Sequence, residues 1–389
     1  MSVTAAKGFR AAGVHCGIKA SGAPDLALVV TADGRPVNAA GVFTQNLACA
    51  GPVRVSQHHL VATSGRAAAV VLNSGNANCA TGTDVKVAET MCSLTADAIG
   101  AHTQDVLVCS TGLIGIPLDP SVFTDGIPAA AEQLDASPAA GAAAARAIMT
   151  TDTVDKQVVV EGDGWVIGGM AKGAAMLAPN MATMLAVLTT DAAVEPADLH
   201  RALAAAVKAS FNRIVVDGCT STNDTVLVLA SGAAGPPADR HRFEDALASA
   251  CGSLARQMAA DAEGHTKVVT IEVTGAASAA EADRAARKLA TSLLVKCSFY
   301  GNDPYWGRVL SELGVAGVAV DTDSVTIAYG GHIVSRGLAP APHDEAAVRA
   351  VVEAPELTLT CDLRAGRASA WVLTNDLTHA YIDENMGTS

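Results

Sequence analysis

Aromatic side chains are scarce in this chain: Phe, Trp and Tyr make up 3% of its 389 residues, although 50% of the residues are hydrophobic. A chain of this length has room for one large or two ordinary domains, and its core must be aliphatic and rich in alanine. Positive charge is also scarce, because 26 Lys and Arg stand against 39 Asp and Glu. The resulting net charge of -13 offers no basic surface for a phosphate backbone, so we expect no nucleic-acid partner.

Long apolar runs are missing as well. The segment 1–20 contains Lys7 and Arg10 but lacks the uninterrupted apolar core of a signal peptide. The alanine-rich segment 128–149 is interrupted by charged residues and by Pro138, so it predicts a pair of soluble helices rather than a membrane span. We therefore expect a cytoplasmic protein with no membrane partner.

Paired cysteines and common cofactor motifs are absent. The nine cysteines are odd in number and scattered, and none forms a Cys-x-x-Cys pair, so we expect reduced thiols in the core rather than disulfides or a zinc site. The sequence contains no Rossmann glycine fingerprint, no Gly-x-Ser-x-Gly and no His-Glu-x-x-His. A covalent mechanism without cofactor or metal fits these absences best.

The most informative stretch is 172–191, in which a loop-like half precedes a strand-like half. Residues 172–180 are rich in Gly, Ala and Pro, whereas 183–190 is a short apolar run that predicts a buried strand. Thr183 stands at the junction, where a self-cleaving chain places a new N-terminal nucleophile. Its hydroxyl would attack the carbonyl of Ala182, move the acyl group from nitrogen to oxygen, and leave an ester for water to open.

Cleavage between Ala182 and Thr183 would give Thr183 a free α-amine. The reference pKa of such an amine, about 7.7 to 8.0, suits a base for the threonine's own hydroxyl. By local pattern alone, a threonine at the start of a strand is more often a β-branched residue that only packs. The nucleophile hypothesis therefore depends on the whole segment rather than on one residue.

Two further loops carry polar groups that fit alternative functions. Residues 73–82 join an expected strand to an expected helix at 84–99, but they lack the Gly-Lys-Ser/Thr ending of a phosphate loop, so we favour a turn that lines the site. Residues 217–225 could form a metal loop, but they lack the alternation and the distal Glu of hard-cation sites. We favour a hydrogen-bonded structural turn close to the nucleophile.

The segment 110–115, Ser-Thr-Gly-Leu-Ile-Gly, follows an expected strand at 106–109. A hydroxyl, a glycine and backbone N–H groups at the end of a buried strand are typical of an oxyanion hole, although an ordinary turn with glycine for its φ angle is the commoner explanation. Farther along, Glu263 stands at the end of a helix expected over 243–260. A carboxylate there opposes the helix dipole by a few tenths of a kcal/mol, which hints at another role.

The pattern Lys-Gly-x-x-Met-x-x-Pro-Asn-Met-Ala-Thr-Met-Leu-x-x-Leu-Thr-Thr-Asp-Ala, which begins at Lys172, resembles the self-processing segment of ornithine acetyltransferase. This family, also called glutamate N-acetyltransferase, belongs to arginine biosynthesis. The resemblance extends over nearly the whole chain, from Gly-Phe-Arg-Ala-Ala-Gly-Val near residue 8, through Gly-Val-Phe-Thr-Gln-Asn at 41–46, to His-Ala-Tyr-Ile-Asp-Glu-Asn at 379–385.

The resemblance implies roles for residues in the first half of the chain. In the family the matching Thr-Gly pair stabilises the oxyanion, which implies Thr111 and Gly112 here. Lys172, expected on a loop after a hairpin, is implied to contact the substrate's amino-acid portion together with Thr150 or Thr151. Its positive charge suits an α-carboxylate.

Residues of the second half are implied to complete the substrate site. The matching Glu of the family touches the substrate, which implies that Glu263 contacts the substrate's amino group. In relatives the Asn of the C-terminal tail, here Asn385, binds substrate together with a Ser or Thr five residues later. Only four residues follow Asn385, so Thr388 or Ser389 would take that second place.

These expectations combine into one hypothesis. The fold is a mixed α/β sandwich of the Ntn-hydrolase type with a smaller C-terminal α/β region, cut into an α chain (1–182) and a β chain (183–389) that assemble as α2β2. N-acetylornithine would acylate Thr183, and glutamate would then take the acetyl group, with no cofactor and no metal. Three alternatives stay open: the same site also accepts acetyl-CoA, the chain is a self-processing amidase or aminopeptidase, or it is a non-catalytic binding protein in which Thr183 only packs.

Overall fold

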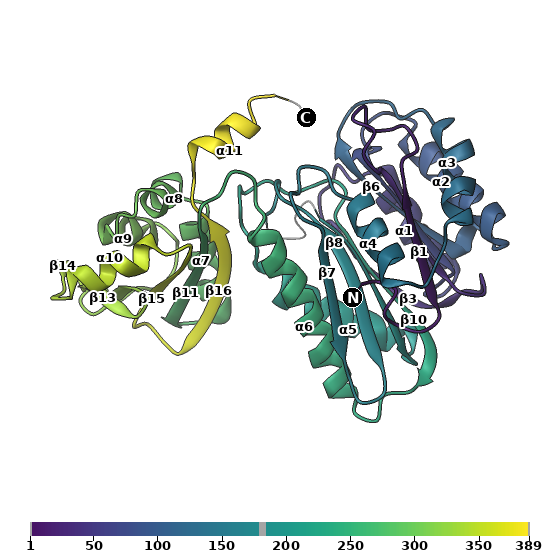
Figure 1. Ribbon diagram of the computed structural model, residues 1–389. Coiled ribbons are helices and arrows are strands. Elements are labelled where there is room, and N and C mark those ends of the chain that lie inside the picture. The colour runs from purple at the N-terminus through teal and green to yellow at the C-terminus, as the bar shows by residue number, and fades with distance from the viewer. Residues whose placement is uncertain (1, 179–183, 388–389) are drawn as a thin grey trace. The chain divides into compact units, whose positions relative to one another are not determined.

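A computed structural model describes residues 2–178 and 184–387 of the chain (Figure 1). The chain forms two compact units: the first runs to Asn212 and includes Cys219–Met258, and the second comprises Arg213–Gly218 and the chain from Ala259 onward. The division expected between Ala182 and Thr183 is a cleavage site that separates two fragments, and it differs from the boundary between these two units. It falls within the first unit, and both residues lie outside those described.

Two sheets form the centre of the first unit. The four-stranded sheet has the order β1-β2-β5-β6, with β1 (Phe9–Val14), β2 (Leu26–Thr31), β5 (Ala69–Asn76) and β6 (Val106–Leu113). The six-stranded sheet has the order β4-β3-β10-β9-β8-β7, with β3 (Val37–Phe43), β4 (Arg66–Ala67), β7 (Lys156–Glu161), β8 (Val166–Lys172), β9 (Leu185–Ala192) and β10 (Thr225–Gly235). Both sheets are mixed, because β5 and β6 are parallel, as are β9 and β10, while the other neighbours run antiparallel.

The two sheets pack face to face around an aliphatic core. One cluster of buried side chains takes residues from both sheets: Phe9, Val29, Leu72 and Leu107 from the four-stranded sheet, and Met170, Val187 and Leu227 from the six-stranded one. Every residue of β2 and of β9 is buried, which explains why both strands have continuous apolar runs instead of alternation. The mixed α/β sandwich predicted from the sequence is confirmed.

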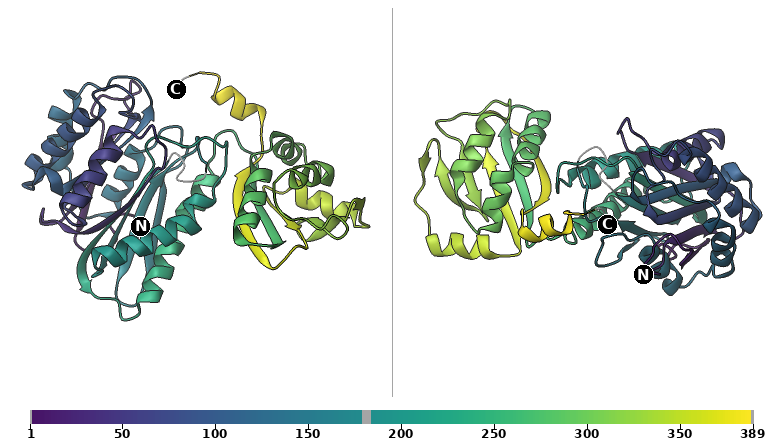
Figure 2. Two further views of the ribbon diagram at one scale, coloured as in Figure 1. Left: turned by 180° about the vertical axis from the view of Figure 1, so that it is seen from behind. Right: turned by 90° about the horizontal axis from the view of Figure 1, so that it is seen from above.

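Helices cover the outer faces of the sandwich (Figures 1 and 2). The helical elements of this unit are α1 (Gly51–Ala62), α2 (Asp84–Ile99), η1 (Thr103–Asp105), α3 (Val122–Glu132), α4 (Pro138–Ala147), α5 (Pro196–Ala209), η2 (Phe211–Arg213, ending at the boundary) and α6 (Arg240–Ala259). A second cluster joins α2 and α3 to the four-stranded sheet, with Met91 and Phe123 fully buried against Leu28 and Val71. The helix predicted over 84–99 is α2.

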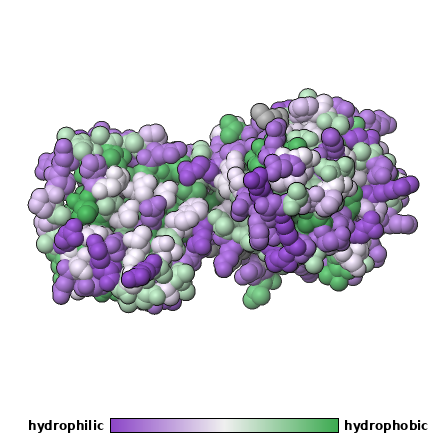
Figure 3. Space-filling view, turned by 90° about the horizontal axis from the view of Figure 1, so that it is seen from below, coloured by the Kyte–Doolittle hydropathy of each residue, from purple (hydrophilic) through white to green (hydrophobic). Residues whose placement is uncertain are grey.

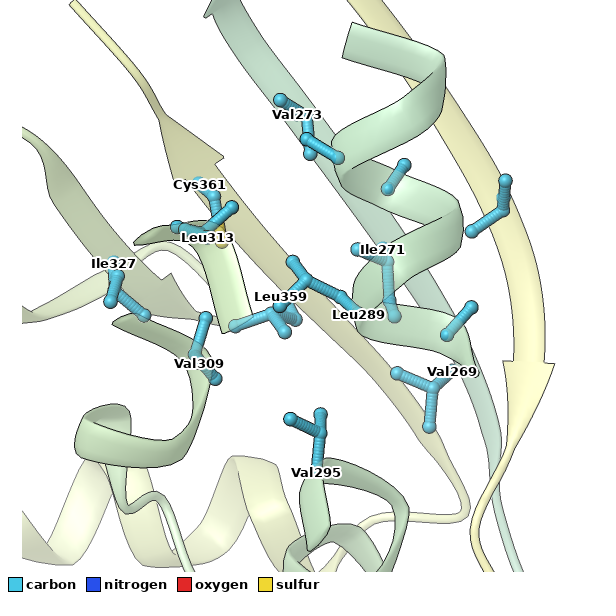
Figure 4. Close-up of a cluster of buried hydrophobic side chains, with 14 of the residues drawn as sticks. Val269, Ile271, Val273, Leu289, Val295, Val309, Leu313, Ile327, Leu359 and Cys361 are labelled. Carbon is cyan, nitrogen blue, oxygen red and sulfur yellow. The ribbon is translucent and has the colours of Figure 1, made fainter. Parts of the chain in front are cut away.

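The second unit is a six-stranded sheet with helices. Its order is β14-β13-β12-β15-β11-β16, with β11 (Val268–Ala276), β12 (Thr326–Tyr329), β13 (His332–Arg336), β14 (Ala339–Pro340), β15 (Glu356–Asp362) and β16 (Ala368–Asn375). The helices are α7 (Ala279–Ala290), α8 (Leu293–Tyr300), α9 (Trp306–Gly314), α10 (Glu345–Glu353) and α11 (His379–Glu384). Figure 4 shows its core, where Ile271 and Leu359 of the sheet meet Leu289, Val295 and Val309 of the helices. The smaller C-terminal α/β region was correctly predicted.

Two expectations from the sequence concern membrane-spanning helices and the burial of the cysteines. Among the described residues, no helix is long and apolar enough to cross a membrane. The face in Figure 3 is a mosaic of hydrophilic and apolar residues.

None of the cysteines in the described part of the chain forms a disulfide. The prediction that all nine are core thiols was wrong for Cys219 and Cys297, which are exposed. Cys219 lies in the polar turn before β10, and Cys297 lies in α8 between the buried Lys296 and Ser298.

Candidate active site

The sequence suggested that Thr111 and Gly112 follow a strand ending at residue 109. In the structure both lie inside β6, which continues to Leu113. At this point the pairing of β5 with β6 becomes irregular, with Asn76 opposite both Thr111 and Leu113. Gly112 has φ = +133°, and a Cβ atom there would lie 2.3 Å from the backbone carbon of Gly75. No other residue fits this conformation and this close approach. The backbone at Gly112 is therefore bent out of the regular ladder next to the Thr111 hydroxyl.

Lys172 is buried at the end of strand β8, which corrects the prediction that it lies on a loop. Its side chain reaches the two threonines that the resemblance singled out: Nζ donates to Thr150 Oγ1 over 2.7 Å and to Thr111 Oγ1 over 3.3 Å. Thr150 is partly buried, whereas Thr151 is exposed. The structure thus brings Lys172, Thr111 and Thr150 together and leaves Thr151 at the surface.

Asp152 organises this group, and the sequence analysis missed it. Oδ1 accepts from Lys156 Nζ and from the Gly173 N–H, both over 2.7 Å, and Oδ2 accepts from the Thr150 N–H over 3.0 Å. Lys172 Nζ lies 3.9 Å from Oδ2. Burial alone would raise the pKa of Asp152, but Lys172 and Lys156 outweigh it and hold that pKa at about 2. The sequence does contain an indication of this ion pair, because Lys156 follows Asp152 by four residues. An analysis based on the pattern of hydrophobic residues does not detect it.

The loop 217–225 has the structural role that the sequence favoured. Asn223 is buried and donates through Nδ2 to the carbonyls of Ala77 (2.6 Å) and Ser110 (2.9 Å). It thereby ties the loop after β5 to the residue before Thr111. No group of three or more His, Cys, Asp or Glu within the described ranges is arranged to hold a metal ion.

Glu263 and Asn385 meet in the second unit. Asn385 Nδ2 donates to Glu263 Oε2 over 2.8 Å and to the Tyr381 carbonyl over 2.9 Å. Helix α6 ends at Ala259, so Glu263 lies in the following turn and the argument from the helix dipole was wrong. The adjacent Gly264 is needed there, because a Cβ atom would lie 2.2 Å from the Tyr381 nitrogen. This contact fixes α11 beside Glu263.

A cavity of about 210 Å³ opens beside Glu263, and a buried lysine that the sequence analysis did not single out lines it. Lys296 Nζ donates to Thr374 Oγ1 over 3.0 Å and also to the Asn375 carbonyl. Burial lowers the pKa of Lys296 to about 8, against the opposing charges of Asp376 and Asp217. The cavity therefore has charged groups of both signs and the size of an amino-acid side chain.

Four predicted site residues lie outside the described residues: Ala182 and Thr183 at the expected cleavage site, and Thr388 and Ser389 at the C-terminus. Within the first unit, a buried ammonium group held by two hydroxyls lies next to a backbone position open only to glycine. In the second unit, a carboxylate and an amide border a small cavity. These are the features of an enzyme that binds small polar molecules rather than of a structural protein.

Comparison with known proteins identifies the family. The ArgJ family model matches residues 10–387. The arginine biosynthesis bifunctional protein ArgJ of Streptomyces coelicolor is 47% identical over 390 residues, which cover all of both chains. Among solved structures, the protein of that name from Bacillus halodurans is 37% identical, with a TM-score of 0.48 over 51% of this chain and 95% of that one. Ornithine acetyltransferase from Mycobacterium tuberculosis, solved with ornithine, is 45% identical, with a TM-score of 0.44 over 46% and 94%.

The chain belongs to the ArgJ family. It is therefore an acyltransferase of arginine biosynthesis, and the resemblance noted in the sequence is confirmed.

Proposed function

We propose that this acyltransferase moves an acetyl group from N2-acetyl-L-ornithine to L-glutamate through an acyl-enzyme on Thr183, after the chain has cut itself between Ala182 and Thr183. The observation that carries the proposal is the contact of Lys172 Nζ with both Thr111 and Thr150. Lys172 also pairs with Leu185 across β8 and β9, two residues beyond Thr183 in the sequence. The proposed oxyanion donor Thr111, the ammonium group of Lys172 and the strand that follows Thr183 in the sequence are thus connected.

In the self-cleavage step, the Thr183 hydroxyl adds to the Ala182 carbonyl and the C–N bond breaks. The acyl group is then an ester on Thr183, and the proton has moved to the released nitrogen. Water hydrolyses the ester, which leaves a carboxylate on Ala182 and a free α-amine on Thr183. That amine is the base in all later steps.

In the transfer step, the α-amine takes the hydroxyl proton while Oγ of Thr183 attacks the acetyl carbonyl of N-acetylornithine. Thr111 and Gly112 donate hydrogen bonds to the oxyanion, and the proton passes to the departing α-nitrogen of ornithine. Glutamate then attacks the acetyl ester with its amine; the bond between the acetyl carbon and Oγ breaks, the α-amine of Thr183 passes the proton of the attacking amine to Oγ, and N-acetylglutamate leaves. An oxyanion donor of this kind contributes about a hundredfold to a thousandfold in rate. The reaction breaks one N-acetyl amide and forms another of similar free energy, so no cofactor is required.

Substrate binding is assigned to two sets of residues. Lys172 and Thr150 would hold the α-carboxylate of each amino acid, because their contacts give one positive charge and one hydroxyl at a buried point. In the second unit, Glu263 and Asn385 are proposed to bind a substrate amino group. The second ligand of the tail is Ser389 or Thr388.

We also propose that the two fragments assemble as α2β2 in the cytoplasm. Native mass measurement tests the assembly, which should contain two copies of each fragment. A single α and a single β fragment per particle would contradict it.

N-terminal sequencing of the purified protein tests the cleavage. We expect a second terminus that begins Thr-Met-Leu-Ala-Val, and the Thr183→Ala variant should stay a single chain of 39.1 kDa. A wild-type protein that remains uncut would contradict the proposal. Acetyl transfer from N-acetylornithine to glutamate should also exceed hydrolysis of the donor, since an amidase would show the opposite ratio.

A second activity with acetyl-CoA as donor would use the same acyl-enzyme. The cavity beside Glu263, at about 210 Å³, has room for an amino-acid side chain and not for a whole CoA molecule, so most of a bound CoA would lie outside it. Release of free CoA thiol in the presence of glutamate measures this activity directly. An enzyme that only recycles acetyl groups from N-acetylornithine releases none.

A further inference from the structure

Asp224 is a buried carboxyl group to which no step above gives a role. It is fully inaccessible, and it lies between Asn223 and Thr225, the first residue of strand β10. Its Oδ1 accepts a hydrogen bond from the Met184 N–H over 2.9 Å. Its own carbonyl accepts from the Thr44 N–H over 2.9 Å, which anchors the residue to the chain after β3.

The position of Met184 gives this contact its meaning. Met184 follows Thr183 directly, and its N–H belongs to the planar peptide group that contains the carbonyl of Thr183. The carbonyl of Met184 is held as well, since it accepts from the Thr225 N–H over 3.2 Å. Asp224 and Thr225 therefore hold both polar backbone groups of the residue next to the expected nucleophile.

The carboxyl group is suited to act in its neutral form. Burial raises the pKa of Asp224 well above its usual range. Hydrogen bonds from the Met184 N–H and the Ser221 side chain, and the positive charge of Lys172, lower this pKa but do not cancel the effect of burial. A neutral carboxyl has one acceptor oxygen and one O–H. With Oδ1 used by Met184, the proton belongs on Oδ2, which has no hydrogen-bond partner among the described residues.

We propose that Asp224 is a positioning residue that holds the peptide group between Thr183 and Met184 through the Met184 N–H, and so fixes the direction of the nucleophile in self-cleavage and in acyl transfer. This inference rests on the proposed function, because it takes Thr183 as the nucleophile. Small errors in the placement of a reacting group reduce rates steeply, so loss of the anchor should lower rates without changing substrate affinity.

Asp191 supplies a matched control on β9, the strand that follows Met184. Like Asp224 it is a buried aspartate, and its Oδ1 accepts from the Val166 N–H over 2.7 Å. It lies seven residues after Met184 in the sequence, which at about 3.3 Å per residue is roughly 23 Å along the strand. Replacement of Asp191 removes backbone hydrogen bonds of the same kind far from Thr183, since its Oδ2 also accepts from the Lys7 N–H over 3.3 Å.

The experiment follows full-length chains made by cell-free synthesis, with the second N-terminus quantified over time. We expect Asp224→Ala to slow self-cleavage about tenfold to a hundredfold, because the Met184 N–H loses its acceptor. Asp191→Ala should cleave at the wild-type rate. Asp224→Asn should also cleave near that rate, because an amide oxygen replaces the neutral carboxyl as acceptor.

For the cleaved enzymes, kcat per α/β pair should fall in Asp224→Ala while KM stays the same, and Asp224→Asn should restore kcat. The inference is overturned if Asp224→Ala cleaves as fast as Asp191→Ala, or if Asp224→Asn is as slow as Asp224→Ala. The second comparison decides the matter even if the alanine variant does not fold, since slow cleavage by a folded Asp224→Asn chain refutes the acceptor role. Failure of the wild-type chain to cleave would instead refute the proposed function.

Discussion

Replacement of Asp152 by Asn should destabilise the first unit through a charge rather than through packing. The two side chains have nearly the same shape, but the amide carries no charge to face Lys156 Nζ at 2.7 Å and Lys172 Nζ at 3.9 Å. Loss of one partner of a buried ion pair costs about 3–5 kcal/mol, because the other charge stays buried without compensation. The pKa of about 2 for Asp152, against 3.8 for the ordinary group, gives a lower figure of about 2 kcal/mol.

Thermal unfolding at two pH values measures this effect. A loss of 2 to 5 kcal/mol corresponds to about 4–10 °C for a unit of this size at neutral pH. The folded-state pKa of Asp152 lies below the unfolded value, so the stabilisation is complete above about pH 4 and is lost as the pH falls toward 2. The difference in Tm between wild type and Asp152→Asn should therefore shrink across that window.

A second substitution separates charge from shape. Lys156→Met added to Asp152→Asn removes the ammonium group left without its carboxylate, so the double variant should be more stable than Asp152→Asn alone. Equal Tm losses at pH 7 and pH 2.5, or a double variant less stable than the single one, would refute the electrostatic explanation.

Three further predictions concern the two units. Gly112→Ala should lower kcat at least about a hundredfold or prevent folding, since its Cβ atom has no room against Gly75; steady-state kinetics and circular dichroism distinguish the two results. Lys172→Met should raise the KM of both amino-acid substrates about tenfold or more with little change in secondary structure, and an unchanged KM would contradict its role as carboxylate ligand. In the folded protein, a thiol reagent should modify Cys219 and Cys297 first and should reach Cys92, whose pKa burial raises, only on unfolding.

Local patterns in the sequence predicted the elements that carry continuous apolar runs or clear helix starts. The helix expected at 84–99 is α2, the strand expected at 106–109 begins β6, and the strand expected at 183–190 overlaps β9. Helices such as α1 and α7 were missed. In α7 the buried positions Ala282, Ala285 and Ala286 are alanines, so its core-facing stripe does not stand out in an alanine-rich sequence.

The site could be predicted only where the family motif supplied it. Lys172 was named by resemblance, but its burial depends on contacts with Thr111 and Asp152, which come from other elements of the chain. Asn223 joins carbonyls more than 100 residues away, those of Ala77 and Ser110. The local periodicity of the sequence does not predict such hydrogen bonds. Polar residues that connect distant loops can therefore be identified only once the fold is known.

The order of strands in the six-stranded sheet indicates that the proposed cut before Thr183 would leave the fold intact. Strands β9 and β10 come from the C-terminal side of the cut, yet they lie between β3 and β8 from the N-terminal side. Their side chains Val187 and Leu227 share one core with Met170 of β8. Separation of the fragments would expose the edges of β3 and β8 and open that core, at a cost comparable to unfolding the sandwich. The cleavage that we propose would therefore release an amine at Thr183 while the sheet holds the two fragments together.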